Sequence, residues 1–137
     1  MAPLSMDTGA MIFTALQVAL GGAIGAACRY LTNVAMKALL GIGFPWGTLT
    51  VNIVGSFLMG ALVVVLARKG GTHLTPFLMT GVLGGFTTFS AFSLDAIFLM
   101  EEGKSEIALI YIAVSVLISL AALVAGLALA RGLVPLP

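Results

Sequence analysis

Polar side chains are rare in this sequence, and those that recur at helical spacing are the residues that could do chemistry. Six of them fall at four-residue intervals within two largely apolar segments: Thr48, Asn52 and Ser56 in one, and Tyr111, Ser115 and Ser119 in the other. Residues four apart lie on one face of an α-helix, so each set forms a polar stripe. Two stripes on two helices are the pattern of a lined path for a small solute.

The groups in these stripes are hydroxyls and one amide, which favours an anion over a cation as the solute. Such groups donate hydrogen bonds, whereas a cation is expected to be surrounded by carboxylates or carbonyls. Ser and Thr in membrane helices also bond to their own backbone or join helices, and for either stripe alone this explanation is as good as a functional one. Asn52 favours function, because one backbone carbonyl cannot satisfy an amide with two donors and an acceptor.

A third apolar segment has glycines at its centre and predicts a broken helix. Gly81, Gly84 and Gly85 are followed by Thr87 and Thr88, and a glycine costs a helix about 1 kcal/mol relative to alanine. Broken backbone at membrane depth is tolerated where it is buried in protein or faces a cavity. Its free carbonyls can then coordinate a cation.

Two phenylalanines, Phe89 and Phe92, follow the predicted break and share a helix face because they are three residues apart. Taken alone, this spacing favours lipid-facing or core side chains. The functional alternative is that the positive edges of the rings face an anion. Asp95 lies deeper in the segment than Glu101 and Glu102, and the sequence assigns it no role.

The elements that position these residues follow from the composition. Of the 137 residues, 61% are apolar and 8% are charged, against about 45–50% and about 25% in soluble domains. This excludes a soluble domain, and a net charge of +1 without a basic cluster excludes a nucleic-acid binder. Four stretches, at residues 10–28, 46–66, 75–100 and 107–130, have the roughly 20 apolar residues of a spanning helix. We predict an all-α membrane protein: a single four-helix transmembrane domain over residues 1–137, its third helix broken in mid-membrane.

The basic residues divide equally between the two ends of the predicted helices. Short loops rich in Lys and Arg stay in the cytoplasm. Here each side carries three basic residues: Arg68, Lys69 and Arg131 on one, and Arg29, Lys37 and Lys104 on the other. Either other signals set the orientation or the chain inserts both ways. We favour dual topology, with two oppositely inserted copies paired as an antiparallel homodimer, since four helices are few to enclose a polar path.

The first predicted helix carries a packing motif and a charge. Gly21 and Gly25 form the small-residue pattern that lets helices approach closely. Arg29, four residues later on the same face, either extends to the lipid headgroups or draws an anion into a vestibule. The sequence favours neither role over the other.

Three strings of residues together resemble the Fluc (CrcB) family of bacterial fluoride channels: GxxGAxxRY at 22–30, WGTLTVNIVGSF at 46–57 and GGFTTFSAFS at 84–93. The resemblance covers all but the termini. It implies a four-span protein of the bacterial inner membrane that forms an antiparallel, dual-topology dimer in the lipid bilayer. It also implies passive export of fluoride through two pores, which protects the cell from fluoride toxicity.

By position, the resemblance also implies which residues form the ion pathway. These are Asn52, Phe89, Phe92, Thr48, Thr88, Tyr111, Ser115 and Ser119. Backbone carbonyls of Gly84 and Thr87 from both copies would hold one structural sodium ion at the dimer centre, where its positive potential helps an anion. Family members often have a hydroxyl residue at the place of Ala91, so this chain lacks one donor there.

The alternative function is that of a proton-coupled small multidrug-type transporter, which also has four spans and dual topology. Such a carrier requires a membrane-embedded carboxylate in its first helix, and residues 10–28 contain neither Asp nor Glu. A structural subunit without transport would explain the glycines but not Asn52 or the stripes. We do not expect an enzyme, because the sequence has no His, Cys and carboxylate cluster with metal-ligand spacing.

Overall fold

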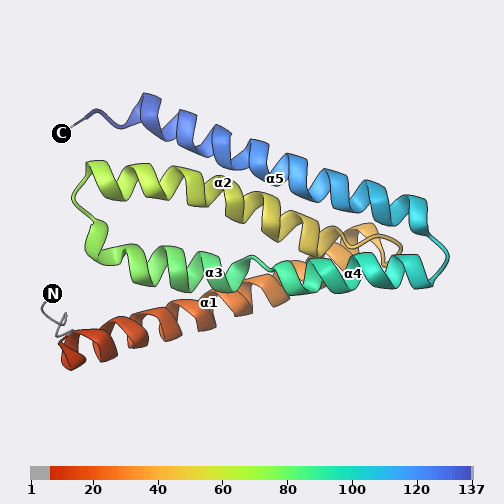
Figure 1. Cartoon of the computed structure of the whole chain (residues 1–137), viewed down its shortest axis with the longest axis horizontal. Helices are drawn as coiled ribbons and strands as arrows, with labels where there is room; N and C mark the ends of the chain where they lie inside the picture. The colour runs from red at the N-terminus through yellow and green to blue at the C-terminus, as the bar shows by residue number, and fades with distance from the viewer. Residues whose placement is uncertain (1–6, 137) are drawn as a thin grey trace, which may run out of the picture.

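Four long, apolar helical segments make up the fold. In the computed structural model, which describes residues 7–136, they are α1 (Thr8–Leu40), α2 (Trp46–Arg68), a divided third segment (Thr72–Glu101) and α5 (Ser105–Leu133). Each is long and apolar enough to cross a membrane. The segments run along the long axis of the molecule, and α1 begins at the end of the bundle where α5 finishes (Figure 1). The prediction of an all-helical, multi-pass membrane protein is confirmed.

The third segment is interrupted, as predicted, and its parts differ in helix type. A short 3-10 turn, η1 (Thr72–Leu74), precedes the π-helical η2 (Pro76–Leu83), which continues into α3 (Gly84–Phe86). The helix α4 (Phe89–Glu101) follows after two residues with extended backbone. These are Thr87 (φ -83°, ψ 159°) and Thr88 (φ -155°, ψ 124°). The break therefore comes after the glycines of this segment and not at them.

The central glycines instead let α1 and the third segment approach each other. A methyl group on Gly25 would overlap the carbonyl oxygen of Val82 and lie 2.8 Å from the amide nitrogen of Phe86. One on Gly85 would lie 2.5 Å from the carbonyl oxygen of Gly22. Backbone meets backbone here, so the small-residue pattern of α1 serves close packing, as the sequence predicts.

The first helix is longer than the apolar stretch that predicts it. The sequence ends that stretch at residue 28, but α1 continues through Arg29 and Lys37 to Leu40. It ends at Gly41, whose φ of 82° a glycine adopts readily. The apolar stretch bounds what can lie in hydrocarbon, whereas the helix continues until the backbone turns. The other three segments extend beyond the predicted spans by a few residues at most.

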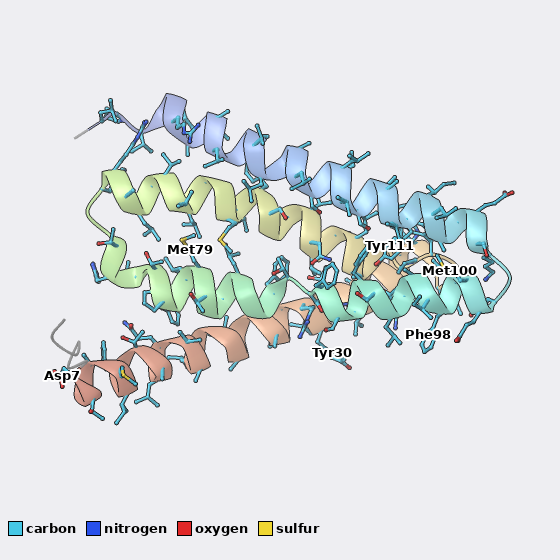
Figure 2. The ribbon with its side chains drawn as sticks, in the orientation of Figure 1. Asp7, Tyr30, Met79, Phe98, Met100 and Tyr111 are labelled. Atoms are coloured by element: carbon cyan, nitrogen blue, oxygen red, sulfur yellow. The ribbon has the colours of Figure 1, made fainter. Side chains whose placement is uncertain are left out.

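The outer surface of the bundle is apolar, as a lipid-facing surface must be. Tyr30 on α1 and Phe98 on α4 point away from the other helices (Figure 2) and are 67% and 52% exposed. Within the bundle, α2 and α5 pack closely, because a methyl group on Gly126 would lie 3.0 Å from the amide nitrogen of Ala61. Arg68 of α2 donates to backbone carbonyls at the end of α5, including that of Arg131 at 2.9 Å. This bond joins the ends of the two helices.

Two glycines of α1 that are three residues apart allow a matched test of this packing. Gly25→Ala should destabilise the protein by about 1–3 kcal/mol, because the added methyl group displaces the backbone of η2 and α3. Gly22→Ala is the control, since its methyl group would meet only the Gly81 carbonyl oxygen at 4.0 Å. Thermal unfolding of the purified variants in detergent measures the difference, and equal stability of the two variants would contradict the packing described here.

Candidate ion pathway

Two residues from each predicted polar stripe and the helix break meet in one groove. A cavity of about 310 Å³ lies between α2, α5 and the junction of α3 with α4. Its polar lining comes from all three elements: Asn52, Ser56, Thr87, Thr88, Ser115 and Ser119. Phe89, Phe92 and apolar side chains of α5 complete it. Among residues 7–136, the lining of this cavity includes no charged side chain.

Two hydroxyls in the groove are buried without a hydrogen-bond partner. Ser115 is 5% exposed, and neither its Oγ nor that of Ser119 has a partner within the described part of the chain. A buried polar group left unpaired costs about 1–3 kcal/mol. Several Ser and Thr hydroxyls elsewhere in the molecule bond to their own helix, as Ser93 does by donating to the Phe89 carbonyl at 2.9 Å. Ser115 and Ser119 therefore each keep a hydroxyl that no described protein group satisfies.

Asn52 makes two hydrogen bonds to the backbone at the break. Its Nδ2 donates to the carbonyl oxygen of Thr88 at 2.9 Å, and its Oδ1 accepts from the amide nitrogen of Thr88 at 2.8 Å. This pairing sets the orientation of the side-chain amide, because the Thr88 N–H requires an acceptor. One Nδ2 proton of the two remains unused by Thr88. Asn52 thus contributes a donor, and not its oxygen, to the groove.

Thr88 is also the N-cap residue of α4. Its Oγ1 accepts from the amide nitrogen of Ala91 at 3.2 Å, which is the N-cap bond of a helix whose preceding residue is extended. The Thr87 hydroxyl donates back to the Leu83 carbonyl at 2.9 Å. The two threonines therefore supply local bonds for the backbone on both sides of the break.

The phenylalanine pair lies beside the break, with one ring buried and one exposed. The ring centroids of Phe89 and Phe92 are 5.5 Å apart. Phe92 is 9% exposed, whereas Phe89 is 78% exposed and extends from the open side of the groove. Both rings line the cavity, so the shared face predicted from their spacing places them together at this site.

Thr48 and Tyr111, the remaining members of the two stripes, lie outside this groove. Tyr111 is fully buried between α5 and the third segment (Figure 2), and its hydroxyl donates to Oδ2 of Asp95 at 3.2 Å. Thr48 and Asp95 line a second cavity of about 200 Å³, together with Lys37. The α2 stripe is thus divided between two cavities, whereas in the α5 stripe Ser115 and Ser119 line the first cavity and Tyr111 lines neither.

An aromatic row separates the two cavities. The ring of Phe92, at the first cavity, lies 5.3 Å from that of Tyr111, which in turn meets Phe44 at 5.4 Å. Phe44 lines the second cavity. The sequence did not reveal the contact between Tyr111 and Asp95, since no spacing rule relates residues on two different helices. Arg29 does not line either of these cavities; the carbonyl of Arg29 accepts a bond from Asn33 at 3.0 Å.

These features define a multi-pass α-helical membrane protein with an uncharged, donor-lined groove at a helix break. The family described as "CrcB-like protein, Camphor Resistance (CrcB)" matches residues 16–127 of the chain. The chain belongs to this family. Its relatives include proteins named fluoride-specific ion channel FluC from Cereibacter sphaeroides and Ruegeria sp., which are 63% and 61% identical to it. Each alignment covers 89% of this chain and 98% of the relative. The resemblance to the CrcB family is confirmed.

The unpaired hydroxyls give a stability test. Ser115→Ala should leave the protein as stable as before, or more stable by up to about 3 kcal/mol, because the change removes a buried group that has no partner. Ser93→Ala is the matched control on a neighbouring helix, since its hydroxyl is bonded. The measurement is thermal unfolding in detergent without fluoride. A clear loss of stability in Ser115→Ala, beyond that of Ser93→Ala, would show that its hydroxyl has a structural partner.

Proposed function

We propose that this protein is a fluoride-selective channel that lets fluoride leave the bacterial cytoplasm passively and so protects the cell from fluoride toxicity. The observation that carries the proposal is the groove lined by Asn52, Ser115 and Ser119, where two buried hydroxyls have no partner in the described chain. The names of the relatives agree with this function.

The chemistry of the groove suits a small, strongly hydrated anion. Such an ion loses water only where several donors replace it, and hydroxyl, amide and ring-edge groups occur together here. Phe89 and Phe92 supply the ring edges. The absence of charge from the lining residues described above is equally important, since a fixed cation would hold the anion and slow its release. Tyr111, between the two cavities, and Thr48, in the second cavity, would continue the path.

The working unit in this proposal is an antiparallel homodimer with two pores. The groove is open on one side, and Phe89 is largely exposed there. Facing lipid, the polar lining would have no partners, whereas a second copy would enclose it. The equal division of the six basic residues between the two ends gives insertion no preferred orientation and so favours dual topology in the bacterial inner membrane.

The backbone at the break fits a structural sodium ion. In a continuous helix, Gly84 O would accept from the Thr88 amide and Thr87 O from the Ala91 amide. Here those two amides bond to Asn52 Oδ1 and Thr88 Oγ1 instead. The carbonyls of Gly84 and Thr87 are thereby released, and carbonyls are ligands that a sodium ion accepts. Bound at the dimer centre, sodium would supply a positive potential that favours an anion nearby.

A liposome assay tests the proposal. Protein reconstituted into vesicles loaded with potassium fluoride or potassium chloride should release fluoride and retain chloride when a potassium ionophore is added. Asn52→Asp should abolish the flux, because it places a negative charge in the groove, and Phe92→Ile should slow it severely by removing a ring edge. Ser93→Ala, with its hydroxyl on its own helix, is the control. Absence of fluoride flux in the unsubstituted protein, or equal passage of chloride, would overturn the proposal.

Dual topology has its own test. A single cysteine at the exposed loop position 73, introduced as His73→Cys together with Cys28→Ala, should react with a membrane-impermeant thiol reagent from both sides of the membrane. Labelling of intact cells is compared with labelling after permeabilisation, and about half of the cysteine should react in intact cells and nearly all of it after permeabilisation. Reaction from one side only would show a single orientation.

A further inference from the structure

The same side chain that contributes a donor to the groove also determines which backbone carbonyls are free at the break. Asn52 reaches from α2 to Thr88 and bonds to both its amide nitrogen, at 2.8 Å, and its carbonyl oxygen, at 2.9 Å. Thr88 is 7% exposed, so its backbone groups have little access to water as alternative partners. The two bonds therefore decide how the backbone is paired here.

The pairing with Asn52 competes directly with helix continuation. Without it, the Thr88 amide would find its nearest acceptor at the carbonyl of Gly84, four residues earlier, and α3 would continue. An extended backbone at Thr87 and Thr88 separates the two groups instead. Gly55, one turn from Asn52 on α2, leaves the space for this arrangement, because a methyl group there would overlap Cγ2 of Thr87.

We propose that Asn52 is a positioning residue for the cation site as well as a lining residue of the anion groove. By accepting a hydrogen bond from the Thr88 amide, Asn52 keeps the carbonyl of Gly84 unpaired. It also holds Thr87 and Thr88 in an extended conformation, in which the Thr87 carbonyl makes no helical hydrogen bond. The inference rests on the proposed sodium site. It couples the two ions through one side chain, since a substitution at Asn52 alters sodium binding even where fluoride is absent.

Sodium binding to the full-length protein in detergent measures this coupling without any transport. The unfolding temperature is followed as sodium chloride replaces N-methyl-D-glucamine chloride at constant ionic strength, with no fluoride present. A ligand that binds only the folded state raises this temperature with its concentration. The unsubstituted protein should therefore become more stable with sodium, and the concentration dependence gives an apparent affinity.

Asn52→Leu should weaken the apparent sodium affinity about tenfold or more, equivalent to about 1.4 kcal/mol, because the Thr88 amide returns to the Gly84 carbonyl. Ser119→Ala is the matched control: it changes the same groove but has no bond to the break, so its sodium response should equal that of the unsubstituted protein. An unchanged sodium response in Asn52→Leu would overturn the inference.

If Asn52→Leu does not fold, the sodium response of Asn52→Asp tests the same inference. The carboxylate retains an acceptor for the Thr88 amide but places a negative charge in the groove. It should therefore lose fluoride flux and retain a sodium response within about threefold of the unsubstituted protein. Loss of the sodium response in a folded Asn52→Asp protein would refute the role of the acceptor bond.

The two proposals fail in different ways. If the unsubstituted protein conducts fluoride but is not stabilised by sodium, the proposed sodium site and the role of Asn52 in it are both wrong. The proposed function as a fluoride channel is then still supported. If sodium stabilises all variants equally, the sodium site stands and the role of Asn52 in it is refuted.

Discussion

Backbone that leaves a helix inside a membrane must find its hydrogen bonds within the protein. The rest of this structure depends on the bonds that satisfy the non-helical backbone at Thr87 and Thr88. Water is absent from the hydrocarbon core, so each unpaired N–H or C=O there is costly. Asn52 supplies both an acceptor and a donor to Thr88, and the Thr88 hydroxyl begins the next helix. The break is therefore a stable part of the fold, and it places polar side chains, freed carbonyls and the phenylalanine pair within one short region.

Close packing by glycine keeps that region in place. Gly25 and Gly85 bring α1 and the third segment into backbone contact, and Gly55 admits the side chain of Thr87 against α2. Larger residues would separate these elements and move Thr88 away from Asn52. The glycines that lower the helix propensity of the third segment thus act mainly through the helix that packs against them. The break itself is made three residues further along by a side chain from another helix.

An uncharged groove is also a consequence of this construction. The donors come from Ser115 and Ser119 on α5 and from Asn52 on α2, while the charged residues Lys37, Asp95 and Glu102 line the second cavity. Tyr111 stands between them with its hydroxyl directed to Asp95. An anion that passes from one cavity to the other would therefore leave a region with charge and enter one where only weak, multiple donors hold it, as conduction requires.

The sequence by itself determined the membrane location, the four helical segments, the interruption of the third one and the family, because apolar length, glycine content and local strings of residues are properties of neighbouring positions. It also identified Asn52, Phe89, Phe92, Ser115 and Ser119, which the fold brings together. Only the tertiary structure decided that Thr48 and Tyr111 lie outside the groove, and that Asn52 pairs with Thr88 and Tyr111 with Asp95. The physical reason is that these contacts join residues far apart in the chain, here 36 positions for Asn52 and Thr88. The relative position of two packed helices sets such contacts, and no periodicity within either helix encodes it.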